Sequence, residues 1–119
     1  GVWGFLKGVY SGNNKIYIVI ESENKTNINY DLETITFITK VVDKSEKDLQ
    51  GEDKVLTPIW QTELETLSKK AKQKMIFVFD KFTLAENKSL MFVMDEKEGE
   101  RTLQIPISSK YVNGAEFIK

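Results

Sequence analysis

The chain has no histidine and no cysteine among its 119 residues, and Arg101 is the only arginine among 17 basic residues. Without imidazole or thiol groups it lacks the commonest general base, the commonest zinc and copper ligands and the thiolate nucleophile. A single arginine supplies little bidentate phosphate recognition. Acidic and basic residues are interspersed at a formal net charge of -1, so nothing attracts nucleic acid strongly. We therefore expect a non-enzymatic binding or structural domain, without cofactor or metal and without direct nucleic-acid reading.

Long apolar stretches are also missing. No segment reaches the roughly 18 to 20 apolar residues of a membrane-spanning helix, and the chain opens on Gly1 without a charged and then apolar leader. Its length suits one domain, since about 120 residues can bury roughly two-thirds of their unfolded surface without disulfides. We expect residues 1–119 to form a single domain, the C-terminal part of a longer exported protein.

The apolar residues that are present alternate with polar ones at the period of a half-buried strand. Val2 to Tyr10 alternates, which places Trp3, Phe5 and Val9 on one face, and Lys15 to Glu23 alternates in the same way. Between them, residues 11–14 read Ser-Gly-Asn-Asn and accept positive φ angles, so they predict a hairpin turn.

The middle of the chain gives weaker signals. Leu32 to Val42 resumes the strand pattern, whereas Asp43 to Asp53 has eleven residues of which only Leu49 is apolar and predicts an exposed loop. Val55 to Glu65 is a weaker strand, and its Pro58 indicates an edge or a bulge because proline cannot donate a ladder hydrogen bond. Glu65 to Lys74 has helical spacing of its apolar residues and predicts a helical turn.

The C-terminal half holds the richest strands. Lys74 to Phe82 and Lys88 to Asp95 are apolar on both faces and should lie centrally, followed by a strand from Arg101 to Ile107 and a short capped helical turn from Ser108 to Gly114. Together these segments give seven strand candidates at about 8 to 15-residue spacing. The pattern predicts an all-β, antiparallel two-sheet sandwich of the immunoglobulin-like kind.

Two acidic patterns could suggest chemistry. Two pairs of glutamates project from one strand face with their side chains roughly 7 Å apart: Glu21 with Glu23, and Glu63 with Glu65. Such a separation resembles that of the two catalytic carboxylates of a glycosidase. A solvated sheet face carries charges at this spacing routinely, and no apolar pocket is indicated that would raise a carboxyl pKa. The acids of Asp43 to Asp53 are interleaved with lysines and lack calcium-loop spacing. We expect no catalytic residue and no metal ligand.

The tryptophans allow a second hypothesis. Trp3 and Trp60 either fill a core or rim, as large aromatics commonly do, or form an exposed platform for sugar or protein. The second hypothesis is therefore a carbohydrate-binding or adhesin-type sandwich of a surface protein.

One asparagine-rich connection predicts a rigid turn. Residues 24–29 contain Asn24, Asn27 and Asn29, whose amides bond nearby backbone. Tyr30 follows and is expected to bury its ring while its hydroxyl bonds backbone, as in a tyrosine corner. Arg101 has Glu96, Glu98 and Glu100 as neighbours and is expected to form a surface ion pair worth about 0 to 1 kcal/mol.

Three segments carry a family resemblance: residues 23–31 (ENKTNINYD), 77–84 (FVFDKFTL) and 95–103 (DEKEGERTL). In order and spacing they resemble the C-terminal region of the TraN family of conjugative transposon proteins of Bacteroides-type elements, over about Val9 to Ile118. The family usually has a basic Lys-Arg-Thr segment where residues 48–54 are acidic on balance here, and paired glycines where this chain has Gly99 followed by Glu100.

The resemblance implies a non-enzymatic assembly module of a type IV secretion-like apparatus, similar to its outer-membrane-ring subunit. Its implied location is the periplasm at the outer membrane, and its implied partners are other channel subunits, a small lipoprotein and further copies in a ring. Exposed strand edges suit such a role, because a partner strand pairs through main-chain groups. The residues expected to bind a partner are Trp60, Ile59, Trp3, Asp48 and Glu52.

Overall fold

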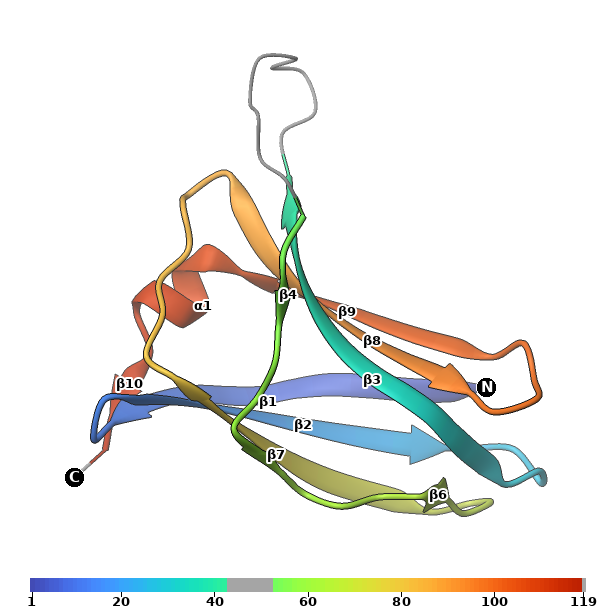
Figure 1. The fold of residues 1–119 in the computed structure, drawn as a ribbon. Helices are drawn as coiled ribbons and strands as arrows, with labels where there is room; N and C mark the ends of the chain where they lie inside the picture. The colour runs from blue at the N-terminus through green and yellow to red at the C-terminus, as the bar shows by residue number, and fades with distance from the viewer. Residues whose placement is uncertain (43–52, 119) are drawn as a thin grey trace.

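The computed structural model describes residues 1–42 and 53–118, which form two packed β-sheets (Figure 1). One sheet has the strand order β10-β1-β2-β7-β5 and the other β4-β3-β8-β9, with β6 also paired to β3. The strands are β1 (Val2–Gly12), β2 (Lys15–Asn24), β3 (Tyr30–Val41), β4 (Val55–Leu56), β5 (Trp60–Gln61), β6 (Thr66–Leu67), β7 (Lys72–Asp80), β8 (Lys88–Glu96), β9 (Thr102–Ser108) and β10 (Glu116–Phe117), and the helix is α1 (Ser109–Asn113).

The strand order is that of an immunoglobulin-type sandwich. There the first, second, fifth and fourth strands form one sheet and the third, sixth and seventh the other. The first sheet of this structure has the corresponding order β1-β2-β7-β5. The second has the corresponding order β3-β8-β9, with β4 added beside β3. The all-β, two-sheet sandwich expected from the alternation is therefore confirmed.

The core is centred on a cluster of phenylalanines from both sheets. The Phe37 ring contacts Phe77, Phe79 and Phe92 edge to face, at centroid distances of 4.9, 5.0 and 5.5 Å. All four side chains are buried. Edge-to-face pairs add about 0.5 to 1.5 kcal/mol each beyond area burial, so this cluster holds the two sheets in contact without a disulfide.

Two predicted local structures are confirmed. Asn13 and Asn14 connect β1 to β2 with φ angles of 51° and 59°, the left-handed pair that a two-residue hairpin needs. The helix α1 is capped by the Ser108 side chain, which accepts a hydrogen bond from the Lys110 N–H, and it ends at Gly114.

A bulge in β1 corrects the expected division of its side chains. The pairing with β2 shifts between Leu6 and Gly8, so Lys7 is an extra residue. An extra residue reverses the alternation beyond it. Val9 is therefore buried in the core, on the face opposite to the exposed Trp3 and Phe5. The prediction that these three residues share a face was wrong.

The segment from Val55 to Leu67 is not the single weak strand predicted for Val55 to Glu65. It crosses between the sheets at the edge of the sandwich (Figure 1): β4 pairs with β3, β5 pairs with β7, and β6 returns to β3. Pro58 lies between β4 and β5, which agrees with the expected edge position. Each pairing lasts only two residues because the chain changes sheet.

The helical turn predicted for Glu65 to Lys74 is absent from this described stretch. Leu67 is buried in β6 opposite Tyr30, and Lys70 turns the chain into β7 with a φ of 58°. Sheet pairing and core burial override a weak helical spacing. No helix among residues 1–42 and 53–118 has the length and apolar character to cross a membrane.

Candidate functional site

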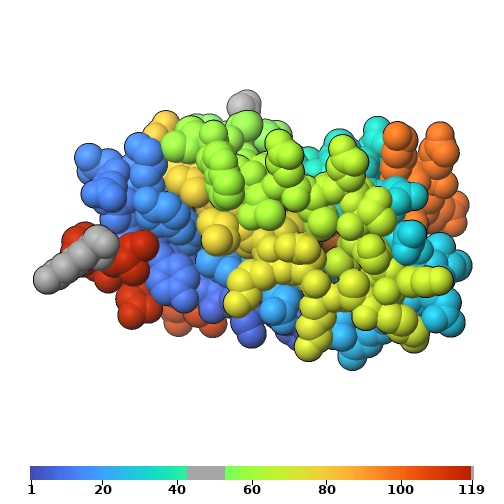
Figure 2. All heavy atoms as spheres, turned by 90° about the horizontal axis from the view of Figure 1, so that it is seen from below, coloured from blue at the N-terminus to red at the C-terminus, as the bar shows by residue number. Residues whose placement is uncertain are grey.

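The outer face of the β1-β2-β7-β5 sheet carries a row of aromatic and apolar side chains. Register places Tyr10 opposite Tyr17, Tyr17 opposite Val78, and Val78 opposite Trp60. Directly opposed residues share a face, and Val78 alternates with buried Phe77 and Phe79. The row therefore points away from the core across all four strands. Figure 2 views this side of the molecule, with β7 in yellow across its centre.

A second apolar row lies beside the first. Gly8 is opposite Val19, and Val19 is opposite Ile76, which is 39% exposed. A Cβ at Gly8 would lie 2.6 Å from the Tyr10 hydroxyl oxygen and 2.8 Å from its ring, so the tyrosine ring covers this glycine. The two rows form a continuous apolar surface.

The other half of the same face is charged. Glu21 is opposite Lys74 and Glu23 is opposite Lys72, so β2 presents a column of acids and β7 a column of lysines. The neighbouring β1 adds Phe5 opposite Glu21. We name the whole surface, apolar rows and charged columns together, the outer face of the first sheet.

Both tryptophans lie on this outer face, at opposite corners. Trp60 and Trp3 are 57% and 52% exposed. Trp3 is seven residues from Tyr10 along β1, and Tyr10 is three strands from Trp60, which separates the two indoles by roughly 25 Å. One sugar ring cannot stack on both.

Ile59 lies at the edge of this sheet and is 54% exposed. Its N–H donates to the Val78 carbonyl at 2.7 Å, which holds β5 on β7. Beside it is a small cavity of about 160 Å³ lined by Phe79 and Phe82. The three exposed candidates are thus Trp60, Ile59 and Trp3. Asp48 and Glu52 lie outside the described residues, as do residues 43–52 of the loop weighed as a calcium site.

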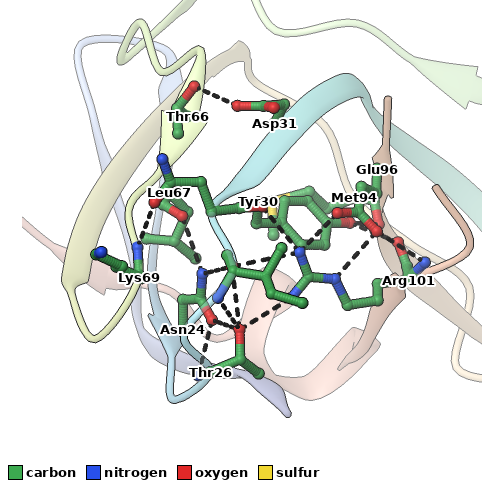
Figure 3. A network of polar contacts seen from close by, with 12 residues as sticks. Asn24, Thr26, Tyr30, Asp31, Thr66, Leu67, Lys69, Met94, Glu96 and Arg101 are labelled. Carbon is green, nitrogen blue, oxygen red and sulfur yellow. Dashed lines mark hydrogen bonds and ion pairs between the residues drawn. The ribbon is translucent and has the colours of Figure 1, made fainter. Parts of the chain in front are cut away.

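A polar network ties three turns together at one end of the sandwich (Figure 3). The buried Asn24 amide donates to the carbonyls of Ile28 and Leu67 at 2.8 and 3.1 Å, and its oxygen accepts from the Thr26 N–H at 3.0 Å. Asn29 accepts from the Lys69 N–H at 2.8 Å. Of the predicted turn residues, Asn24 and Asn29 therefore hold the connection, whereas Asn27 is exposed and shows no side-chain bond to the described part of the chain.

Tyr30 is fully buried, as the corner motif predicted. Its hydroxyl lies 2.9 Å from the Met94 carbonyl oxygen and 2.8 Å from that of Arg101, and its single hydrogen serves both. Burial, with Asp95 and Glu96 nearby, raises the pKa of Tyr30 to about 12. The side chain stays neutral in the folded protein up to strongly alkaline pH.

Arg101 forms more than the exposed ion pair that was expected. Its Nη2 lies 2.6 Å from Glu96 Oε2, and its Nε donates to Oε1 at 3.0 Å. It also donates to Thr26 Oγ1 at 3.1 Å and to the Asn29 carbonyl at 2.9 Å. The hydrogen bond from Arg101 holds the pKa of Glu96 below its usual value. Sequence neighbours indicated Glu96, but nothing local indicated contacts some seventy residues away.

A cleft that the sequence did not suggest lies on the second sheet. It has a volume of about 630 Å³ between β3, β8, β9 and α1, with Met91, Pro106 and Tyr111 among its lining residues. Its surface is mostly apolar, and Lys40 and Lys88 are also among its lining residues. Within residues 1–42 and 53–118 no three acidic side chains gather in a way that could hold a metal ion.

These observations define an immunoglobulin-type β-sandwich with an exposed aromatic sheet face. The chain belongs to the family described as Domain of unknown function (DUF4138), whose model matches residues 1–116. No curated protein and no solved structure matches the chain.

Proposed function

We propose that this domain is a non-enzymatic assembly module of a conjugative DNA-transfer apparatus, similar to the C-terminal domain of TraN-type outer-membrane-ring subunits. The proposal combines the order and spacing of the three segments that resemble that family with the surface of the sandwich. The module works in the periplasm at the outer membrane, and its partners are protein subunits of the channel, a small lipoprotein among them.

The outer face of the first sheet is the main structural support for this proposal. Trp60, Ile76 and Phe5 are 39 to 57% exposed there, on a five-stranded sheet. Soluble monomers rarely leave a large continuous apolar area in water, and such areas usually mark protein interaction sites. Tryptophan and tyrosine are also the residues that most often dominate binding energy at protein interfaces.

The edge at β5 offers a second contact. β5 pairs with β7 over only two residues, and Ile59 and Trp60 project there with more than half of their surface exposed. A strand or extended segment of a channel subunit can bind at such an edge through main-chain pairing.

The experiment is a pull-down with tagged domain from cells that carry the transfer element. We expect recovery of other channel subunits, and we expect Trp60→Ala and Ile59→Pro to reduce it strongly. Ile59→Pro removes the N–H that bonds Val78, so its melting temperature is measured beside the binding.

Tyr111→Ala is the matched control, because Tyr111 is an exposed aromatic on α1, away from this sheet. It should leave recovery unchanged. Recovery of no channel subunit by the unaltered domain, or equal recovery by all variants, overturns the proposal.

The carbohydrate-binding alternative is favoured by the two exposed tryptophans. Their separation of roughly 25 Å requires each to bind sugar alone. Glycan-array binding that Trp60→Ala or Trp3→Ala abolishes would favour this function over protein assembly.

A further inference from the structure

We infer that the protein covering the outer face of the first sheet is a second copy of this chain, in a dimer with two-fold symmetry. The inference rests on the proposed function in taking this face as a protein-binding surface, and it adds the identity of the partner. It follows from the arrangement of side chains along four paired strands.

A two-fold rotation relates the two copies of the inferred dimer. Consider a two-fold axis parallel to the interface, close to the strand direction and midway between β2 and β7. It brings β2 of one copy over β7 of the second, and β1 over β5. A two-fold interface is stable only when a surface complements itself under this exchange. Face-to-face sheets with nearly aligned strands are a common packing in β proteins.

The charged columns meet this requirement. Glu21 and Lys74 are in register on adjacent strands, and so are Glu23 and Lys72. Exchange of β2 with β7 therefore sets each acid over a lysine of the second copy, in both directions. The third charged pair, Lys15 with Asp80, is also in register and obeys the same rule.

The apolar rows also complement themselves when β2 and β7 are exchanged. Val19 and Ile76 share a row, so each lies over the other residue in the second copy. In the next row Tyr17 lies over Val78, and Tyr10 lies over Trp60. In each of these rows the β2 and β7 residues match apolar with apolar or acid with base.

The available area suits a modest interface. The strands β1, β2 and β7 are nine to eleven residues long and β5 has two residues. With strands nearly 5 Å apart, this face presents roughly 500 Å² per copy. The total of about 1,000 Å² lies below the range of stable specific interfaces and in that of weak, transient ones. We therefore expect a dimer that dissociates on dilution.

The first experiment measures oligomeric state by sedimentation velocity over a wide concentration range. The unaltered chain should shift from monomer to dimer, and Ile76→Asp should remain monomeric because a carboxylate then lies against the apolar rows. Met91→Asp places the same change on the outer face of the second sheet and should dimerise normally. A chain that stays monomeric at the highest concentration overturns the inference.

The second experiment separates contacts between copies from contacts within one copy. Glu21→Lys/Glu23→Lys makes both columns basic, and Lys72→Glu/Lys74→Glu makes both acidic. Each variant alone should be monomeric at low salt, whereas an equimolar mixture should form a one-to-one dimer. Dimerisation of either variant alone, or none in the mixture, contradicts the proposed axis.

Failure here is distinguishable from failure of the assembly function. A monomeric chain whose capture of channel subunits still depends on Trp60 overturns the second-copy inference and leaves the assembly proposal intact. A monomeric chain that captures no channel subunit overturns both.

Discussion

The Tyr30 hydroxyl lies 2.8 Å from the carbonyl oxygen of Arg101, while the Arg101 guanidinium lies 5.1 Å from the centre of the Tyr30 ring. Arg101 thus contacts both the hydroxyl group and the ring of Tyr30. The first contact is a partly buried hydrogen bond and the second a cation–π contact. Together they join the start of β3 to the turn before β9, with no covalent link between them.

Removal of the Tyr30 hydroxyl should destabilise the fold. Tyr30→Phe keeps the ring but deprives the Met94 and Arg101 carbonyl oxygens of their shared donor. We expect a loss of about 1 to 3 kcal/mol in the free energy of unfolding, measured by urea denaturation. Tyr111→Phe is the control, since Tyr111 is 60% exposed, and should change stability little. Equal stability of both variants would contradict the role given to this hydroxyl.

Tyr30 also predicts an alkaline loss of stability. Its pKa is raised from 10.0 to about 12 on folding, so its contribution is complete below pH 10. As pH rises from 10 to 12 the unfolded chain releases this proton first, and about 2 to 3 kcal/mol is lost. Urea unfolding across this range should show a steeper decline for the unaltered protein than for Tyr30→Phe. Parallel curves would show that the tyrosine is not the cause.

Glu96 predicts an effect at acid pH. Its pKa is lowered on folding by the Arg101 hydrogen bond, so its contribution is present above its ordinary pKa and is lost as pH falls through the lower folded value. Glu96→Gln should cost about 1 to 3 kcal/mol at neutral pH and flatten the decline below pH 4.5. Glu100→Gln serves as the control on the same turn. An unaltered acid profile in Glu96→Gln would rule out this pair as its origin.

The hairpin between β1 and β2 tests a backbone effect. Asn14 has a φ of 59°, which alanine adopts at a cost of roughly 1 to 2 kcal/mol and glycine without steric cost. Asn14→Ala should therefore lower the free energy of unfolding by about 1 kcal/mol, whereas Asn14→Gly should keep it within about 0.5 kcal/mol. Thermal melts of both variants measure the two stabilities. An equal loss of stability in both variants would indicate a role of the asparagine side chain.

Local patterns predicted the long strands and their turns well. The period-two alternation located β1, β2, β3, β7, β8 and β9, and the Asn-Asn pair and the Ser108 cap lie where their chemistry requires. The same local reasoning misplaced Val9 and assigned a helix near Leu67. In both places a long-range pairing, with β2 or with β3, determines the conformation.

The surface was harder to predict. Trp60 and Trp3 were candidates from composition, yet their common face depends on a register that joins β1, β2, β7 and β5. The self-complementary columns of Glu21 and Lys74 depend on the same register. Residues fifty positions apart along the chain carry no local sign that they will be neighbours.

The lack of imidazole and thiol chemistry follows from the composition alone. The sequence by itself also determined the inward and outward alternation and the tight turns, because each depends on residues within a few positions of one another. Only the tertiary structure decided which strands are neighbours, where β1 bulges, how Arg101 joins its own turn to the turn before β3, and which side chains share the outer face of the first sheet. Pairing between distant strands is selected by the burial of a whole core, and that free energy belongs to the complete fold.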